Sequence, residues 1–249
     1  MSGLLAAEVR KLTTVRTTWI ITGVGLLLVA VGSGFFLFEE EFTGPFTGSD
    51  AEVANAIDQI GGMSVIVLII GLLAMTTEFR YGTIGRTLQF TPSRTTVLAA
   101  KVIVGAGYAV VFFLVGLVAV AVLIGVTGES PTIGNDTLDA LWQGPIALAL
   151  TAVFGVALGA LLRNQVVAIA VTLIYLFIVE TLVNQFYPGI ARWMPFQALN
   201  AVFISEEGME GLPSEFIDPL EPLVGLAVFL AYVLVFSVAA VTLMRRRDV

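Results

Sequence analysis

Two residue types are missing from this chain of 249 residues, and each absence removes a class of chemistry. There is no cysteine, so neither a disulfide framework nor a thiolate metal site can form. There is no histidine, the commonest proton shuttle and metal ligand. Charged residues make up only 12%, against about 25% in soluble domains. With 57% hydrophobic residues, this composition fits only a membrane protein.

Six apolar stretches are long enough to cross a bilayer, which takes roughly 20 residues of helix. They cover residues 19–38, 60–77, 101–126, 141–162, 166–186 and 222–244. The second is short and can extend at either end. The sequence therefore predicts an all-α integral membrane protein with six transmembrane helices, built as one transmembrane domain over residues 1–249.

The charges between these stretches are sorted by sign. Eleven of the twelve cations fall on one side of a six-span arrangement, and only Arg192 falls on the other. Most of the acids fall on the opposite side from the cations, because they follow the first, third and fifth stretches. Cytoplasmic flanks retain Lys and Arg. We therefore expect both termini and residues 78–100 in the cytoplasm, and residues 187–221 outside the cell.

The first 18 residues show helical periodicity. Leu5, Val9 and Leu12 share one stripe, and Glu8 and Lys11 lie off it. This pattern predicts an amphipathic helix over residues 1–18 that lies in the membrane interface. A frayed terminus is the alternative.

A basic segment separates the second and third spans. Gly82 can end a helix that continues from the second span and Thr83 can cap a new one, so "TIGRTLQF" predicts a short transverse helix. Thr91 and Pro92 form a second start pattern, from which one long helix would lead into the third span. The alternative is a loop whose cations only enforce topology and contact anionic lipid.

The stretch "LLAMTTEFRYGTIGRTLQFTPSRTTVLAAK" resembles the region between spans 2 and 3 of ABC transporter permeases of the type-2, exporter-like class. The matching residues are Glu78, Phe79, Arg80, Gly82, Thr83, Pro92, Arg94 and Lys101. The similarity extends to "LRNQVVAIA" around Arg163 and to "WMPFQALNAVF" between spans 5 and 6. Together with the six-span plan, it covers nearly the whole chain.

The resemblance implies a permease subunit of an exporter that forms a translocation path as a dimer and is driven by a separate ATPase. Residues 78–100 would form the coupling segment, in which arginines pair with acids of the ATPase while Ile84, Leu88 and Phe90 fill a groove on it. The residues expected at this contact are Glu78, Arg80, Gly82, Thr83, Ile84, Arg86, Leu88, Phe90, Pro92, Arg94 and Arg163.

The partners implied are two copies of an ABC-type ATPase and a second copy of this chain or a related permease, within the lipid bilayer and without nucleic acid. The chain contains no motor of its own, because neither Lys11 nor Lys101 follows the glycine of a phosphate-binding loop. We expect ATP and Mg²⁺ on the partner, and no catalytic residue, cofactor or metal in this chain. High Ala, Val and Gly contents indicate a bacterial genome, and hence the bacterial cell membrane.

Glu180 is the one acid inside a predicted span, and Asn184 lies one turn further on. A carboxylate at the bilayer centre costs about 2.5–3.5 kcal/mol, but Glu180 lies beyond the midpoint. One interpretation places both residues on the wall of the translocation path. The other gives Glu180 a structural hydrogen bond or a route to the outer surface. Gly155 and Gly159 form a small-residue face that predicts close helix packing within the chain.

Three other classes of function are alternatives to a permease subunit. A secondary transporter driven by an ion gradient usually has inverted repeats and polar or broken helices at mid-membrane, and Glu180 is the only ionisable candidate for such a role. For a membrane-embedded enzyme, the sequence contains no pair of residues that could act as general acid and general base. A subunit that uses an ATPase to remodel or protect the envelope, without moving cargo, stays open. The sequence does not predict the cargo.

Overall fold

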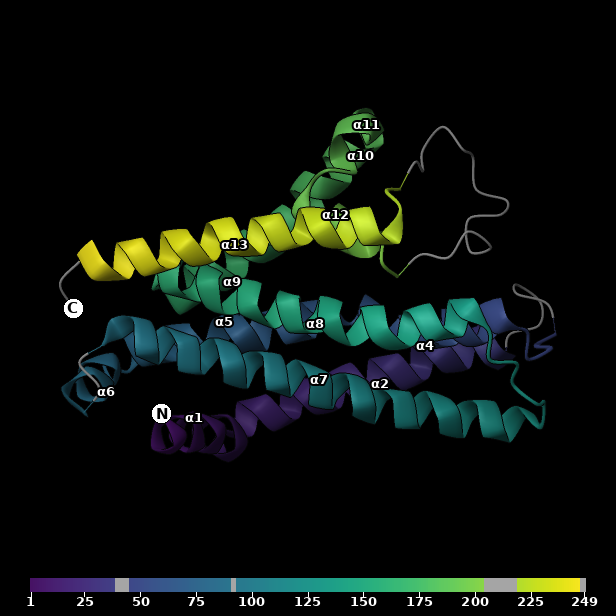
Figure 1. Cartoon of the computed structure of the whole chain (residues 1–249), viewed down its shortest axis with the longest axis horizontal. Coiled ribbons are helices and arrows are strands. Elements are labelled where there is room, and N and C mark those ends of the chain that lie inside the picture. The colour runs from purple at the N-terminus through teal and green to yellow at the C-terminus, as the bar shows by residue number, and fades with distance from the viewer. Residues whose placement is uncertain (39–44, 91–92, 204–218, 247–249) are drawn as a thin grey trace.

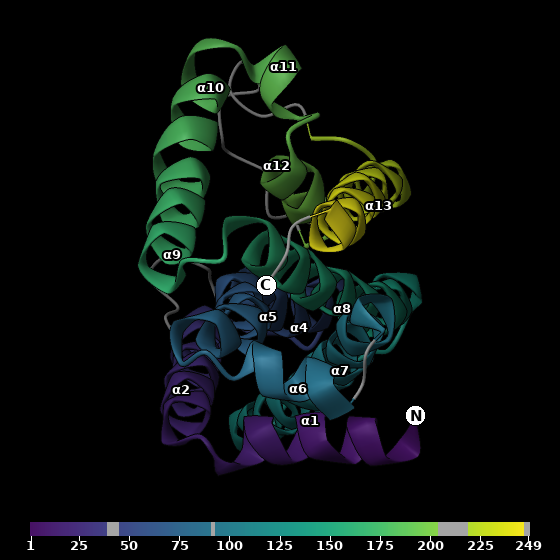
Figure 2. The same cartoon turned by 90° about the vertical axis from the view of Figure 1, so that its left-hand side faces the viewer.

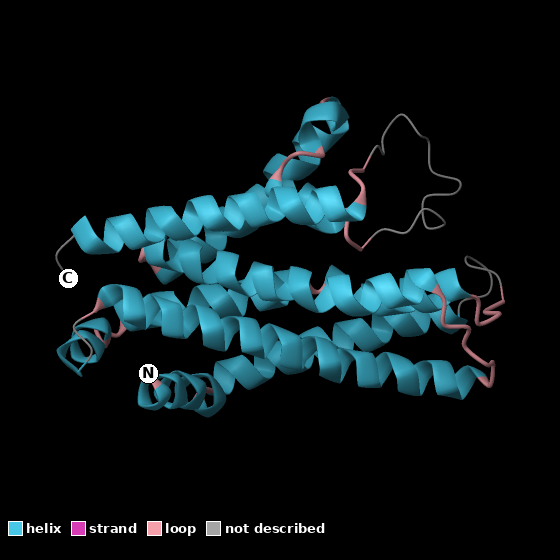
Figure 3. Ribbon diagram, viewed as in Figure 1, coloured by secondary structure: helices cyan, strands magenta, loops and turns pink. Residues whose placement is uncertain are grey.

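The computed structural model describes residues 1–38, 45–90, 93–203 and 219–246, and every regular element in these ranges is a helix (Figure 1, Figure 3). Six helical segments are long and apolar enough to cross a membrane. They are Arg16–Phe38, Asp50–Arg80, Arg94–Thr127, Asn135–Leu162, Gln165–Phe186 and Pro222–Arg246. The predicted all-α fold with six spanning helices is confirmed.

The spans are built from helices of different lengths. The single-helix spans are α2 (Arg16–Phe38), α7 (Arg94–Thr127), α8 (Asn135–Leu162) and α13 (Pro222–Arg246). The second span consists of α4 (Asp50–Gly62) and α5 (Ser64–Arg80). The fifth consists of α9 (Gln165–Ile174), the π-helix η1 (Tyr175–Val179) and α10 (Glu180–Phe186). Short helices lie outside the spans: α1 (Ser2–Thr14), α6 (Ile84–Phe90), α11 (Pro188–Ala191) and α12 (Pro195–Asn200).

Several spans begin at other positions than the sequence predicted, and the starts of α4 and α7 have a local cause. The second span begins at Asp50 rather than at residue 60, because Ser49 and Glu52 form a capping box at the start of α4. The sequence contains this capping-box pattern, which places the acids of residues 50–58 on a helix. The third span begins at Arg94, with the Ser93 hydroxyl accepting a hydrogen bond from the Thr96 amide. The predicted start at residues 91–92 lies outside the described residues.

The centre of the bundle is α8, which packs against α4, α5, α7 and α13. Its closest approach is to α5, where glycines allow the two backbones to meet. A Cβ atom on Gly155 would collide with the carbonyl oxygen of Leu68, and one on Gly71 would collide with that of Ala152. The predicted close packing of the Gly155 face within the chain is therefore confirmed.

The fifth span stands apart from this bundle (Figure 2). Only 17% of its apolar window is buried, against 56% for α8. Its exposed apolar side chains include Val171, Ile174 and Phe177. One side of this span is consequently available to lipid or to another subunit.

The helices at the end that carries both termini are α1, α6 and the last turns of α13 (Figure 1). Helix α1 runs across the bundle axis (Figure 2). The predicted helix at the N-terminus exists, and residues of its apolar stripe differ in exposure. Leu12 packs against the core, whereas Val9 is 47% exposed. Glu8 is only 4% exposed, so helix α1 turns both Leu12 and Glu8 toward the bundle.

We predict that Gly155→Ala lowers the thermal stability of the purified protein, because the added methyl group must push α5 and α8 apart. Overpacking of this kind costs about 1–3 kcal/mol. The matched control is Gly107→Ala on α7, where nothing lies within 4 Å of the added atom. The melting temperature in detergent is the measurement. Equal effects at the two positions would contradict the role of the α5–α8 contact.

Candidate functional site

Four charged side chains meet where α1, α5 and α7 come together. Lys101 of α7 donates to Glu8 Oε2 of α1 and to Glu78 Oε1 of α5, both at 2.7 Å. Lys11 of α1 donates to Glu8 Oε1 at 2.6 Å and to Glu78 Oε1 at 2.7 Å. The third donor of Lys101 reaches the carbonyl oxygen of Ala74 at 2.9 Å. We call Glu8, Lys11, Glu78 and Lys101 the ion cluster.

The two lysines of the ion cluster differ in exposure. The side chain of Lys101 is 1% exposed, and that of Lys11 is 43% exposed. Burial opposes the charge on Lys11, but hydrogen bonds and charge attraction from Glu78 and Glu8 outweigh it, and the pKa of Lys11 rises above its ordinary value. Lys11 therefore stays protonated at neutral pH.

The ion cluster fastens three segments that are distant in the sequence. Buried charges are tolerated when they are paired and hydrogen-bonded, and removing one partner is strongly destabilising. Because the cluster holds two carboxylates and two ammonium groups, its charges cancel. It fixes α1 across the end of α5 and the start of α7, which are the helices on either side of α6.

Glu78 and Lys101 carry the family resemblance in the sequence, whereas Glu8 and Lys11 were expected only to lie off the apolar stripe of the N-terminal helix. Their meeting depends on how α1 packs on α5 and α7, for which the sequence contains no signal. Among the described residues, no three acidic side chains gather closely enough to hold a metal ion.

Helix α6 occupies the position predicted for the short transverse helix. Gly82, with φ of 64°, ends the turn after α5, and the Thr83 amide donates to the Glu78 carbonyl at 3.0 Å. Ile84 is buried in an apolar cluster with Met75, so it faces the bundle. In this arrangement the chain itself covers the Ile84 side chain, and its contact with a partner stays a prediction.

The structure describes only some of the other side chains predicted for the coupling contact. Arg86 of α6 is exposed. The side chains of Leu88 and Phe90 lie outside those described, as does Pro92, and their assignment to a partner contact stays a prediction.

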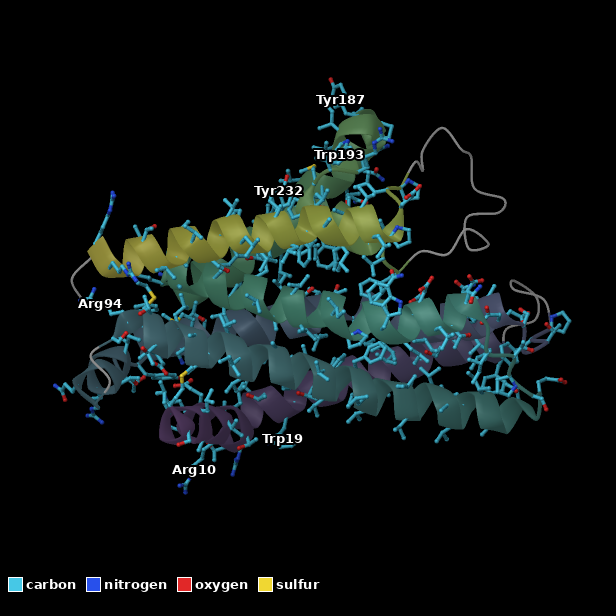
Figure 4. All side chains as sticks on the ribbon, viewed as in Figure 1. Arg10, Trp19, Arg94, Tyr187, Trp193 and Tyr232 are labelled. Carbon is cyan, nitrogen blue, oxygen red and sulfur yellow. The ribbon has the colours of Figure 1, made fainter. Side chains whose placement is uncertain are left out.

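Three of the predicted arginines bind within the protein. Arg94 Nη1 donates to the Met244 carbonyl oxygen at 2.6 Å and so ties the start of α7 to the end of α13 (Figure 4). Arg80 Nη1 donates to Gln165 Oε1 at 3.1 Å, which connects α5 with the start of α9. The guanidinium of Arg163 lies 5.2 Å from the centre of the Phe79 ring. These contacts give the three arginines internal roles.

A cavity of about 370 Å³ borders the ion cluster. All four cluster residues line it. The remaining lining residues are Leu12, Val15, Thr17, Thr18, Ile70, Leu73, Ala74, Thr77, Arg80, Tyr81, Thr83, Val104 and Gln165. Val15 and Tyr81 are exposed, so the cavity reaches the surface of the chain. Its lining combines charged and hydroxyl groups with aliphatic side chains.

Glu180 is fully buried at the start of α10. It accepts hydrogen bonds from the Phe196 amide at 3.1 Å and the Gln197 amide at 2.9 Å. These amides belong to the first turn of α12, where helix amides have no partner within the helix. The contacts favour the structural interpretation of Glu180. Asn184 is half-buried, and its place on a translocation path stays a prediction.

We predict that Lys101→Met lowers the melting temperature strongly, because Glu8 and Glu78 then keep only the half-exposed Lys11. Breaking a buried pair costs about 3–5 kcal/mol. Lys11→Met is the same change at a half-exposed site and should cost about 1 kcal/mol or less. Thermal unfolding of both variants in one detergent compares them. Equal losses, or no loss at Lys101, would contradict the buried cluster.

We predict that Glu180→Gln loosens the segment around α12, since one carboxylate oxygen becomes an NH₂ group that faces backbone amides. Losing a hydrogen bond to a charged group costs about 1.5–3 kcal/mol. Glu221→Gln, at an exposed acid just before α13, is the control. Thermal unfolding and limited proteolysis report the change. An unchanged Glu180→Gln protein would remove the structural role and favour one in the translocation path.

A family model described as ABC-2 family transporter protein matches residues 4–179, which include the ion cluster, α6 and the start of the fifth span. A comparison with curated proteins finds no match. The match covers well over half of the chain, and it agrees with the six spanning helices. The chain therefore belongs to the ABC-2 transporter family and is a multi-pass permease subunit of an ABC transporter.

Proposed function

We propose that this permease is the membrane subunit of an ATP-driven exporter in the bacterial cell membrane. It works as a dimer with two copies of a separate ATPase, which bind ATP and Mg²⁺. Membrane subunits of this family are transport components and generally work with an ATP-binding subunit. Export, rather than import, rests on the resemblance of residues 72–101 to exporter-like permeases.

The observation that carries the proposal is the position of α6 between two helices that the ion cluster holds together. Lys101 bonds to Glu8 and Glu78 across three helices. Ile84 is buried against the bundle, and Arg86 on the same short helix is exposed. A force applied to the exposed side of α6 therefore reaches α5 and α7 through the chain itself, and α1 through the cluster. This is what an ATPase-coupled membrane subunit requires.

The distribution of cations supports a cytoplasmic position for this end. Arg10, Arg86, Arg245 and Arg246 are all exposed there, on α1, α6 and α13. Cytoplasmic flanks of membrane helices carry an excess of such residues. In this orientation α6 faces the compartment that contains ATP.

The exposed apolar surface of the fifth span supports a contact between two subunits and a translocation path beside that contact. It is the span with the smallest buried share, and its exposed residues are large and apolar. We assign it to the contact between subunits, with Asn184 on the path between them. Glu180 would act there indirectly, because its bonds to the Phe196 and Gln197 amides hold α12 beside α10.

We predict that an ATPase with a phosphate-binding loop co-purifies with the tagged chain from native membranes in mild detergent. Arg86→Glu should reduce the yield of that ATPase by about tenfold, because an exposed cation of α6 then repels acids on the partner. Arg246→Glu on α13 is the matched control, with the same charge change at the same end. Mass spectrometry of the eluates provides the measurement.

Two outcomes of the co-purification experiment would contradict the proposal. If no such ATPase co-purifies with the natural chain, the coupling proposal fails. If Arg246→Glu loses the ATPase as completely as Arg86→Glu, the docking surface is not α6.

A further inference from the structure

The charged side chains that line the cavity differ in how far they are enclosed. Those of Glu8 and Glu78 are 5% and 6% exposed, and that of Lys101 is 1% exposed. The Lys11 side chain is 43% exposed, and Arg80 is exposed. With three cations against two acids, the lining has a net charge of +1. A molecule that enters the cavity can therefore reach cations, whereas the acids are closed off within their own ion pairs.

Both reachable cations keep donors for a ligand. Lys11 gives two of its three N–H groups to Glu8 and Glu78. Arg80 has five N–H groups, and one of them, on Nη1, donates to Gln165 Oε1 at 3.1 Å. Charge-assisted hydrogen bonds from lysine and arginine to an anion are about twice as strong as neutral ones. The cavity is therefore suited to an anionic ligand.

Threonine hydroxyl groups add neutral donors to the same lining. Thr17 and Thr18 belong to the first turn of α2, and Thr83 lies in the turn between α5 and α6. The Thr77 hydroxyl is already used, because it donates to the Leu73 carbonyl at 2.6 Å. The donors thus come from several segments and approach a ligand from several sides. A phosphate group presents three acceptor oxygens, against two on a carboxylate, and so matches this set of donors better.

The cavity has room for a phosphate group that belongs to a larger molecule. Its volume of about 370 Å³ lies within the range of about 300–1,000 Å³ that is usual for small-molecule sites. Its lining also includes the aliphatic side chains of Leu12, Ile70 and Leu73. Both soluble phosphate compounds and phospholipids can supply such a group.

We propose that this cavity binds a phosphate group, carried by a soluble molecule or by a membrane lipid. Lys11 and Arg80 neutralise its charge. The hydroxyl groups of Thr17, Thr18 and Thr83 donate hydrogen bonds to its oxygens. The ion cluster keeps all its internal bonds when the ligand is present. Binding requires only this chain, with or without an ATPase.

The test is isothermal titration calorimetry of the purified full chain in detergent with three probes. They are inorganic phosphate, dioctanoyl phosphatidate, and dioctanoylglycerol, which has the same chains but no phosphate. We expect at least one phosphate probe to bind, and phosphatidate counts as bound when its affinity exceeds that of dioctanoylglycerol by about tenfold or more. Binding of inorganic phosphate assigns the site to soluble phosphate compounds, and binding of phosphatidate alone assigns it to lipids. Binding of neither would overturn the proposal.

Two variants and a control locate the site for the probe that binds. Arg80→Gln removes one reachable cation and should weaken binding about tenfold. Arg10→Gln is the matched control, because Arg10 is exposed on α1 and does not line the cavity. Thr83→Val keeps the shape of the side chain and removes one hydroxyl donor, so it should weaken binding about threefold. Equal affinities of Arg80→Gln and Arg10→Gln would overturn the proposal.

The threonine variant keeps the test decisive when the arginine variant is unstable. If Arg80→Gln fails to fold, as judged by its melting curve, Thr83→Val decides against the natural chain. An unchanged affinity in Thr83→Val would then overturn the proposal.

Discussion

Charges can remain beside a hydrocarbon phase only when they neutralise one another, and the terminus-bearing end of this molecule is organised around that condition. Lys101 is fully enclosed, so Glu8 and Glu78 must both be present to balance it. Glu8 comes from α1, which also packs Leu12 against the core. The position of α1 across the bundle therefore reflects both this apolar contact and the requirement to neutralise a buried lysine on α7.

The same helix that supplies Glu78 also makes the closest backbone contact in the bundle. Gly71 of α5 meets α8 at Ala152, and Gly155 of α8 meets α5 at Leu68. Helix α5 is thus fixed along its side by close packing and at its end by the ion cluster. These contacts join α5 to α7 and α8. In the proposed function, a displacement at α6 would therefore be transmitted to the bundle rather than absorbed by one loose helix.

Much of this architecture could be predicted because it depends on local composition. The six spans follow from apolar length, and the break at Gly82 follows from a residue that adopts a positive φ without strain. The ion cluster could not be predicted, because Glu8 and Lys101 are brought together only by the packing of α1 on α7. The inward orientation of Ile84 was missed for the same reason. Periodicity on a helix of seven residues does not say which neighbour covers it.

The fifth span differs from the rest in how it is held. Its exposed sides give it little apolar packing, and a π-helix at Tyr175–Val179 interrupts its regular hydrogen bonding. Polar contacts attach its two ends: Arg80 binds Gln165 at the start of α9, and Glu180 binds the first amides of α12. The first contact originates on α5, two residues beyond Glu78 of the ion cluster. In the proposed function, movement of α5 would therefore reach the fifth span through Arg80 and Gln165, while the bonds of Glu180 hold α10 to α12.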